Sequence, residues 1–315
     1  MSSNVNFFDR DVVSMRDFSR KDIEYIMDLA ETMVPYAKGE KVKHPLDGKI
    51  LGNLFFEPST RTRLSFETAA HRLGAQILDV SQMSATSIAK GETLADTIKM
   101  VDAYCDAMVI RHPWEGSARL ATKYSTGPVV NAGDGAASHP TQTLLDLFTI
   151  SRCKGKIDGL NIALVGDLKY GRTVHSLVDA LMMFDVTLTF VAPESLQMPP
   201  DIVENMRSKG FIPKMTSDLD EAVKDADVLY VTRIQKERFP DPTEYSKVAG
   251  MYRVDKALLM NAKDDIIVMH PLPRVNEIAV EVDDTPNAKY FEQAFNGIPM
   301  RMAILCSILG GDIDG

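Results

Sequence analysis

The chain has 315 residues, of which 45% are hydrophobic and 25% charged, and its formal net charge is −9. These values are ordinary for a soluble globular protein, and the length suits two domains better than a single core. The acidic balance argues against a general nucleic-acid-binding protein. No apolar run is long enough to cross a bilayer, and the amino terminus, MSSNVNFFDRDVV, lacks the pattern of a secretory signal.

The cysteines carry no recognisable chemistry. Cys105, Cys153 and Cys306 are scattered and follow neither a CxxC pattern nor another ligand spacing. They indicate buried or incidental thiols in a reducing compartment, so we expect a cytoplasmic protein without a structural zinc or other metal site.

The predicted elements alternate between strands and helices along the whole chain. A first helix is predicted after Ser19, with apolar residues at helical spacing. Short apolar runs predict strands at 50–56, 77–80, 107–110, 128–131, 160–165, 186–191, 228–232 and 266–269. Helical patterns follow at 61–73, 92–104, 140–152, 174–181, 200–209 and 291–309. This alternation predicts an α/β protein with parallel sheets, and the polar segment 154–159 marks the start of a second domain.

The most informative stretch joins the first predicted strand to its helix. It reads EPSTRTR over residues 57–63 and packs three hydroxyls and two guanidiniums into one turn. A helix amino terminus binds anions, and arginine matches phosphate oxygens in a bidentate manner. Ser59 or Thr60 followed by solvated arginines would also serve as an ordinary helix cap. We favour a phosphate or other oxyanion site, without the pattern of a nucleotide-binding P-loop.

Polar residues also follow the next strands of the first half. Arg111 comes directly after one strand, and His139 and Gln142 follow another through a short Gly-rich turn. Ligands of α/β sheets bind beyond the carboxyl ends of parallel strands, so these residues should converge with the 59–62 turn. The alternative is that His139 is a helix-cap histidine and that Gln142 is solvated.

Residues 81–91 are small and polar and contain one base, Lys90, with Ser87 nearby. The pattern is typical of an ordinary surface loop. The other interpretation is a lid that brings a cation to an anionic ligand.

The second half repeats the arrangement of charge after strands. Lys169 and Arg172 follow one strand, Arg233 and Gln235 follow another within RIQKER, and HPLPR follows the last. Two prolines there fix the backbone, which suits carbonyl groups directed at a ligand. The glycines of GDLKYG are five residues apart, so a dinucleotide-binding GxGxxG turn is disfavoured, and RIQKER could also be a solvated charge run.

Taken together, these motifs resemble the aspartate/ornithine carbamoyltransferase family over roughly residues 7–310. The motifs that carry the resemblance are FEPSTRTR, RHPWEG, HPTQTLLD, VGDLKYGRTVHSL, TRIQKERF and HPLPRVNEI, in that order. RIQKER and HPLP stand where ornithine enzymes carry SMG and HCLP sequences, so the resemblance is to the catalytic chain of the aspartate enzymes. It implies two α/β domains, each with a central parallel sheet flanked by helices, joined by two bridging helices. The expected domains are 1–140 plus 292–315, for carbamoyl phosphate, and 141–291, for L-aspartate.

The resemblance also implies roles for single residues. Carbamoyl phosphate would be bound by Ser59, Thr60, Arg61, Thr62, Ser87, Lys90, Arg111, His139, Gln142, Leu272 and Pro273. L-Aspartate would be bound by Lys90, Arg172, Arg233, Gln235 and Leu272, with Lys169 in the same cluster. Arg61, Arg111, His139 and Lys90 would be catalytic, and Glu57 and Arg238 match residues that pair across the domains.

The implied reaction transfers the carbamoyl group from carbamoyl phosphate to the amine of L-aspartate, an early step of pyrimidine biosynthesis. The amine attacks directly, so no covalent enzyme intermediate and no cofactor is expected. The resemblance implies a homotrimer of catalytic chains and is compatible with a separate regulatory chain, with no nucleic-acid or membrane partner. Two other hypotheses are a carbamoyltransferase for another amino acid and a non-catalytic anion-binding or regulatory protein on the same scaffold.

Overall fold

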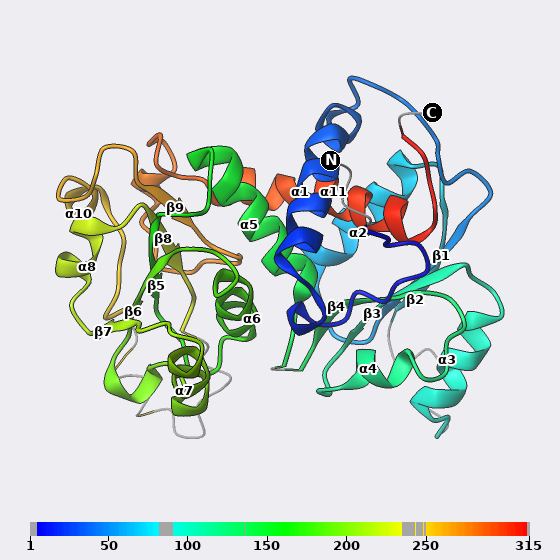
Figure 1. Ribbon diagram of the computed structural model, residues 1–315, viewed down its shortest axis with the longest axis horizontal. Helices are drawn as coiled ribbons and strands as arrows, with labels where there is room; N and C mark the ends of the chain where they lie inside the picture. The colour runs from blue at the N-terminus through cyan, green and yellow to red at the C-terminus, as the bar shows by residue number, and fades with distance from the viewer. Residues whose placement is uncertain are drawn as a thin grey trace. The chain divides into compact units, whose positions relative to one another are not determined.

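The computed structural model describes residues 5–81, 91–135, 137–234, 243, 248 and 250–313. The chain divides into two compact units, Met1–Phe148 with Phe295–Gly315, and Thr149–Ala294 (Figure 1). The division falls inside helices α5 (Pro140–Lys154) and α11 (Tyr290–Ile308), so each of these helices contributes residues to both units. Within the described ranges, no helix is both long and apolar enough to span a membrane.

The first unit contains four parallel strands in the order β2-β1-β3-β4. The strands are β1 (Ile50–Phe55), β2 (Gln76–Ser81), β3 (Ala107–His112) and β4 (Val129–Asp134). The helices that lie wholly within this unit are α1 (Arg20–Lys38), α2 (Thr60–Arg72), α3 (Leu94–Asp102) and α4 (Ser117–Ala121), with a 3-10 turn at Met15–Asp17.

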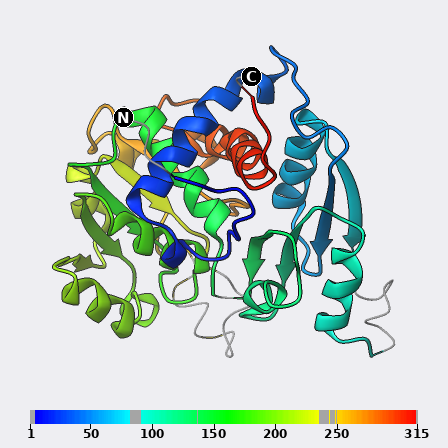
Figure 2. The same cartoon turned by 45° about the vertical axis from the view of Figure 1, so that its right-hand side comes forward.

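The two faces of this sheet are covered by different helices. Crossovers between parallel strands are right-handed, so α2, which leads away from β1 toward the β2 edge, lies on one face. The helices α3 and α4 lead in the other direction and lie on the opposite face (Figure 2). There Ile98, Val101 and Ala121 pack against Leu54 and Met108 of the sheet. The hydrophobic contact on this face therefore holds the carboxyl ends of the strands in a fixed arrangement.

The second unit contains five parallel strands in the order β7-β6-β5-β8-β9. The strands are β5 (Asn161–Val165), β6 (Thr187–Val191), β7 (Lys214–Thr216), β8 (Val228–Val231) and β9 (Ile267–Met269). Among the described residues, the helices of this unit are α6 (Arg172–Leu181), α7 (Pro200–Ser208), α8 (Leu219–Asp225) and α10 (Lys256–Leu259), with 3-10 turns at Glu194–Leu196 and Val280–Val282.

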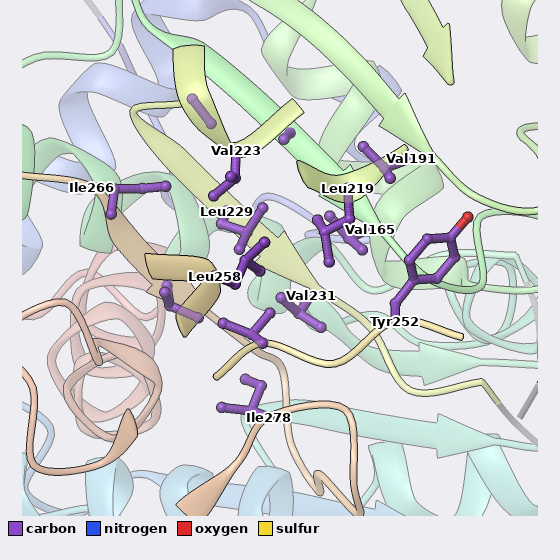
Figure 3. Packing of buried hydrophobic residues seen from close by; sticks show 14 of the residues in the cluster. Val165, Val191, Leu219, Val223, Leu229, Val231, Tyr252, Leu258, Ile266 and Ile278 are labelled. Atoms are coloured by element: carbon purple, nitrogen blue, oxygen red, sulfur yellow. The ribbon is translucent and has the colours of Figure 1, made fainter. Parts of the chain in front are cut away.

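Figure 3 shows how one face of this second sheet is buried. Side chains of β5, β6 and β8 point toward α8 and α10, where Val165, Leu229 and Val231 meet Val223 and Leu258. Alternate residues of a strand point to opposite faces, and β8 is buried throughout because both of its faces are covered. The apolar packing thus sets where each strand ends, and the polar turns beyond it carry the residues of interest.

The predicted alternation of strands and helices is confirmed, and most predicted elements lie within two or three residues of their observed limits. Two differences concern the strand ends. Strands β3 and β4 run on to His112 and Asp134, so Arg111 lies inside a strand rather than after it. Four short described elements, β7, α4, α8 and α10, were not predicted, because β7 is a polar edge strand and the helices span only one to two turns.

Candidate active site

The strand order of the first unit reverses between β1 and β3. From β1 the chain moves to β2 on one side, and from β2 it crosses to β3 on the other. In an open α/β sheet, the crevice at such a switch point is where ligands bind. The amino terminus of α2 and the end of β3 meet there, because Phe56 donates its backbone N–H to the carbonyl of Arg111 at 2.9 Å. The topology therefore brings together two of the predicted anion-binding segments.

The amino terminus of α2 presents backbone N–H groups that have no partner within the helix. Ser59 occupies the N-cap position in an extended conformation, but its side chain makes no capping hydrogen bond, which does not fit the alternative of an ordinary serine cap. The first turn contains no acidic residue, and the first N–H groups of a helix have no partner within it. Thr60 is exposed and Thr62 is buried in the same turn. This helix end suits an anion from outside the chain.

Two arginines of this turn have different surroundings. Arg63 pairs with Glu67 at 2.8 Å and with Asp79 at 2.9 Å, so its charge is already compensated. Arg61 has no carboxylate partner in the described part of the chain. Partial burial lowers the pKa of its guanidinium, although the residue as a whole is exposed. The two guanidiniums of the turn therefore differ, and Arg61, which the resemblance assigns to the phosphate, is the one without a carboxylate partner among the described residues.

Arg111 enters the same switch point from β3. Its Nη1 donates to the carbonyl of Ala132 at 3.0 Å, and its Nη2 lies 3.1 Å from Oε2 of Glu57. The residue is 8% exposed, so the cation is held largely away from water between β1 and β4. A buried guanidinium with fixed partners presents its remaining edge in a set direction.

His139 and Gln142 lie at the start of α5, after β4, which is the neighbour of β3 in the sheet. His139 is 4% exposed, and its carbonyl accepts the backbone N–H groups of Gln142 and Thr143. The side-chain amide of Gln142 donates to Oδ1 of Asp146 at 2.9 Å, so it is partly held by the helix rather than solvated. His139 therefore occupies the predicted helix start while being buried.

The second unit has its own switch point, between β5 and β8. Arg172 begins α6 after β5, and Arg233 follows β8, so both cations lie at the carboxyl ends of neighbouring strands. Thr232 ties these ends together: its hydroxyl accepts the N–H of Asp167 at 3.0 Å and donates to the carbonyl of Val165 at 3.0 Å. Gly166 has a φ of +111°, and a Cβ there would collide with Thr232. Lys169 is exposed and lies over the ring of Tyr170.

The HPLPR segment is held by a buried hydrogen-bonded pair, His270 and Glu277. Nε2 of His270 lies 2.7 Å from Oε1 of Glu277, and Nδ1 accepts the N–H of Leu272 at 2.8 Å. Leu272 has a φ of +56° and is joined to Pro273 by a cis peptide bond. This local backbone is therefore specified by side chains that flank it, as the two prolines led us to expect.

Three predicted site residues, Ser87, Lys90 and Gln235, lie outside the described residues, and so does Arg238. Two residues that sequence analysis did not single out, Asp134 and His270, are buried at the ends of β4 and β9. The sequence signal that could have identified them is an ionisable residue at the end of an apolar strand.

Each unit is thus an open parallel α/β sheet whose switch point carries cationic side chains, which defines a class of proteins that bind small anionic ligands. The family model "Aspartate/ornithine carbamoyltransferase, carbamoyl-P binding domain" matches residues 10–152, and "Aspartate/ornithine carbamoyltransferase, Asp/Orn binding domain" matches residues 158–308. The chain belongs to the aspartate/ornithine carbamoyltransferase family.

Individual relatives agree with this assignment. The chain is 56% identical over 300 residues to an aspartate carbamoyltransferase catalytic subunit of Archaeoglobus fulgidus, covering 95% of this chain and 99% of the relative. It is similar to the solved catalytic subunit of M. jannaschii aspartate transcarbamoylase, with a TM-score of 0.90, 52% identity and coverage of 96% and 98%. An aspartate transcarbamoylase of Trypanosoma cruzi in complex with carbamoyl phosphate and aspartate gives a TM-score of 0.91, 44% identity and the same coverage. The predicted family, two-domain α/β fold and transferase class are confirmed.

Proposed function

We infer that the protein transfers the carbamoyl group from carbamoyl phosphate to the amine of L-aspartate, giving N-carbamoyl-L-aspartate and phosphate. The observation that carries this conclusion is the pair of cationic switch points on a chain so similar to aspartate carbamoyltransferases. One switch point offers a helix amino terminus with Arg61 and Arg111, and the other offers Arg172 and Arg233. A phosphate and two carboxylates are the anions that these groups would bind.

The reaction can proceed without a covalent enzyme intermediate or a cofactor. The aspartate nitrogen forms a bond to the carbamoyl carbon, the carbon–oxygen bond to phosphate breaks, and the amine proton can pass to the departing phosphate. Orientation of the reactants can contribute about 7–11 kcal/mol in well-aligned cases. Donors directed at the developing oxyanion add roughly 3–4 kcal/mol each in favourable sites.

The roles of single residues are part of this proposal. Arg61 and the α2 amino terminus, with Ser59, Thr60 and Thr62, hold the phosphate, while Arg111 and His139 act on the carbamoyl oxygen. The buried state of Arg111 and His139 supports this division, because a donor in a low-dielectric site interacts more strongly with a charge. Gln142 completes the carbamoyl phosphate set. In the second unit, Arg172, Arg233 and Gln235 bind the aspartate carboxylates, and the carbonyls of Leu272 and Pro273 face the amine.

The function is tested by product analysis. The purified protein is supplied with carbamoyl phosphate and a panel of amines, which includes the amino acids aspartate and ornithine and the diamine putrescine as a control. We expect N-carbamoyl-L-aspartate and stoichiometric phosphate. Preferential carbamoylation of ornithine would make the protein a carbamoyltransferase for another amino acid, and no product with any amine would favour a non-catalytic anion-binding protein.

The remaining parts of the proposal concern organisation. We assign carbamoyl phosphate to the domain of residues 1–140 plus 292–315 and aspartate to residues 141–291. We also propose a cytoplasmic homotrimer in which Ser87 and Lys90 act in the active site of the neighbouring subunit, in pyrimidine biosynthesis. The family resemblance supports this arrangement, as does the polar composition of the 81–91 loop. A regulatory chain is compatible with the words "catalytic subunit" in the names of the relatives.

Sharing of sites can be tested by mixing two inactive variants. Lys90→Ala and Arg61→Ala proteins are dissociated, combined and reassembled. In each mixed trimer, about one interface in three joins an intact Arg61 to an intact Lys90 of the neighbouring chain. We expect activity to return in that proportion. Trimers verified as mixed by mass spectrometry but still inactive would show that Lys90 does not serve a neighbouring subunit.

A further inference from the structure

One buried carboxylate beside the candidate site is not among the predicted substrate contacts. Asp134, at the end of β4, is 4% exposed. Its Oδ1 accepts from the side-chain amide of Asn131 at 3.0 Å and from the backbone N–H of Ser138 at 3.1 Å, and its Oδ2 accepts from the N–H of Gly116 at 2.9 Å. All three partners are donors, so the carboxylate acts as an acceptor at both oxygens.

These bonds join two loops that lead to predicted site residues. Gly116 precedes α4 in the loop that follows β3 and Arg111, whereas Ser138 directly precedes His139. The same loops share a backbone bond, since Gly135 donates to the carbonyl of His112 at 2.9 Å. Close approach requires glycine there: Gly135 has a φ of +52°, and a Cβ would lie 2.7 Å from Cγ of Glu115. Asp134 is therefore the side chain that connects the segment after Arg111 with the segment before His139.

A direct role in anion binding does not fit this carboxylate. Its charge would repel a phosphate, and both oxygens are directed at groups of the protein. Burial raises the pKa of Asp134, and the hydrogen bonds from Asn131, Gly116 and Ser138 oppose that effect. Burial of a negative charge close to an anion site costs free energy, and only the hydrogen bonds that the carboxylate accepts offset that cost.

We propose that Asp134 is a positioning residue, which holds Arg111 and His139 at the separation that carbamoyl phosphate requires. This inference rests on the proposed function of the first unit. Arg111 also donates to the carbonyl of Ala132, two residues before Asp134, so a shift at the end of β4 would be transmitted to the guanidinium. Misplacement of a catalytic group by about 1 Å can lower the rate about 100-fold, so the hydrogen bonds of Asp134 have a measurable consequence.

The test is Asp134→Asn, which keeps the shape of the side chain but turns one acceptor oxygen into a donor that faces N–H groups. We expect kcat/KM for carbamoyl phosphate to fall about 10- to 100-fold. KM for aspartate at saturating carbamoyl phosphate should stay within about threefold of wild type, because the second unit is unchanged. Calorimetry with inorganic phosphate should show a parallel loss of affinity.

Asp102→Asn is the matched control. Asp102 also accepts several bonds from a loop, namely those from the hydroxyl of Ser125, the N–H and hydroxyl of Thr126 and the N–H of Gly127. That loop precedes β4, so it lies at the opposite end of the strand from Asp134. We expect Asp102→Asn to lower the unfolding temperature while leaving the kinetic constants unchanged.

The outcomes separate this inference from the proposed function. If both variants lose stability and neither changes kcat/KM for carbamoyl phosphate, Asp134 has a structural role only and the inference is overturned, whereas the wild-type assay still tests the function. If Asp134→Asn does not fold, Asn131→Ala removes one of the three donors and takes its place. It should lower kcat/KM for carbamoyl phosphate several-fold, and unchanged kinetics in that variant would likewise overturn the inference.

Discussion

Replacement of Arg61 by alanine is expected to lower kcat by about 100- to 1,000-fold, which corresponds to roughly 2.7–4 kcal/mol of lost transition-state stabilisation. The reason is the position of this guanidinium in the first turn of α2, where no acidic residue of that turn competes for it. No carboxylate in the described part of the chain pairs with the Arg61 guanidinium. Its charge is therefore available to a phosphate whose negative charge grows as the carbon–oxygen bond breaks.

Arg63→Ala provides the control for this prediction. Arg63 is two residues away on the same helix, but its guanidinium pairs with Glu67 and Asp79. Partly exposed pairs of this kind contribute about 0–1 kcal/mol each, so the variant should lose a little stability and keep its turnover. Both variants should retain the wild-type circular dichroism spectrum. Wild-type kcat in Arg61→Ala, or an equal loss in both variants, would remove Arg61 from the phosphate site.

Replacement of Arg233 by alanine is expected to raise KM for aspartate by about 10- to 100-fold while KM for carbamoyl phosphate changes little. Hydrogen bonds to charged groups contribute about 1.5–3 kcal/mol, and each 1.4 kcal/mol is tenfold in affinity. The residue directly follows Thr232, whose hydroxyl joins the ends of β8 and β5. The position of Arg233 at the switch point is thus set by the sheet.

The matching control is Arg207→Ala. Arg207 is an exposed cation of the same unit on α7, which begins after β6 rather than at the switch point. Steady-state kinetics of the two variants distinguishes a specific contact from a general loss of positive charge. An equal rise in KM for aspartate in both would indicate long-range attraction only, and a larger rise in KM for carbamoyl phosphate would place Arg233 with the other substrate.

The local sequence predicted the structure correctly where one segment contains all the residues that determine its conformation. Helix α1 begins after Ser19 because Ser19 and Asp22 form a capping box, and the glycine at position 39 ends it in a left-handed conformation. Strand β1 and helix α2 were likewise predicted, since apolar side chains fill the strand and Pro58 interrupts it. The rule that ligands bind beyond the carboxyl ends of parallel strands then located Arg61, Arg111 and Arg233 without any knowledge of strand order.

Other features depend on contacts between segments far apart in the chain. Strand β3 continues through Arg111 because Ala132 and Glu57 supply partners for its buried guanidinium. The apolar periodicity of the strand cannot predict partners that lie in other segments. Edge strand β7 forms although its pattern is polar, because β6 provides the hydrogen-bonding edge. Such elements are stabilised by a neighbour, so their own residues carry little signal.

The α/β alternation, the family and the clusters of cations that follow the strands could all be predicted from short segments, because side-chain periodicity and motif spacing are local properties. The tertiary structure shows why Arg61 rather than Arg63 can meet a ligand, since Asp79, the second partner of Arg63, lies on β2. It also decided that the order of the strands reverses between β1 and β3 and between β5 and β8. Those reversals follow from the packing of helices on both faces of each sheet, and no single segment of the chain specifies them.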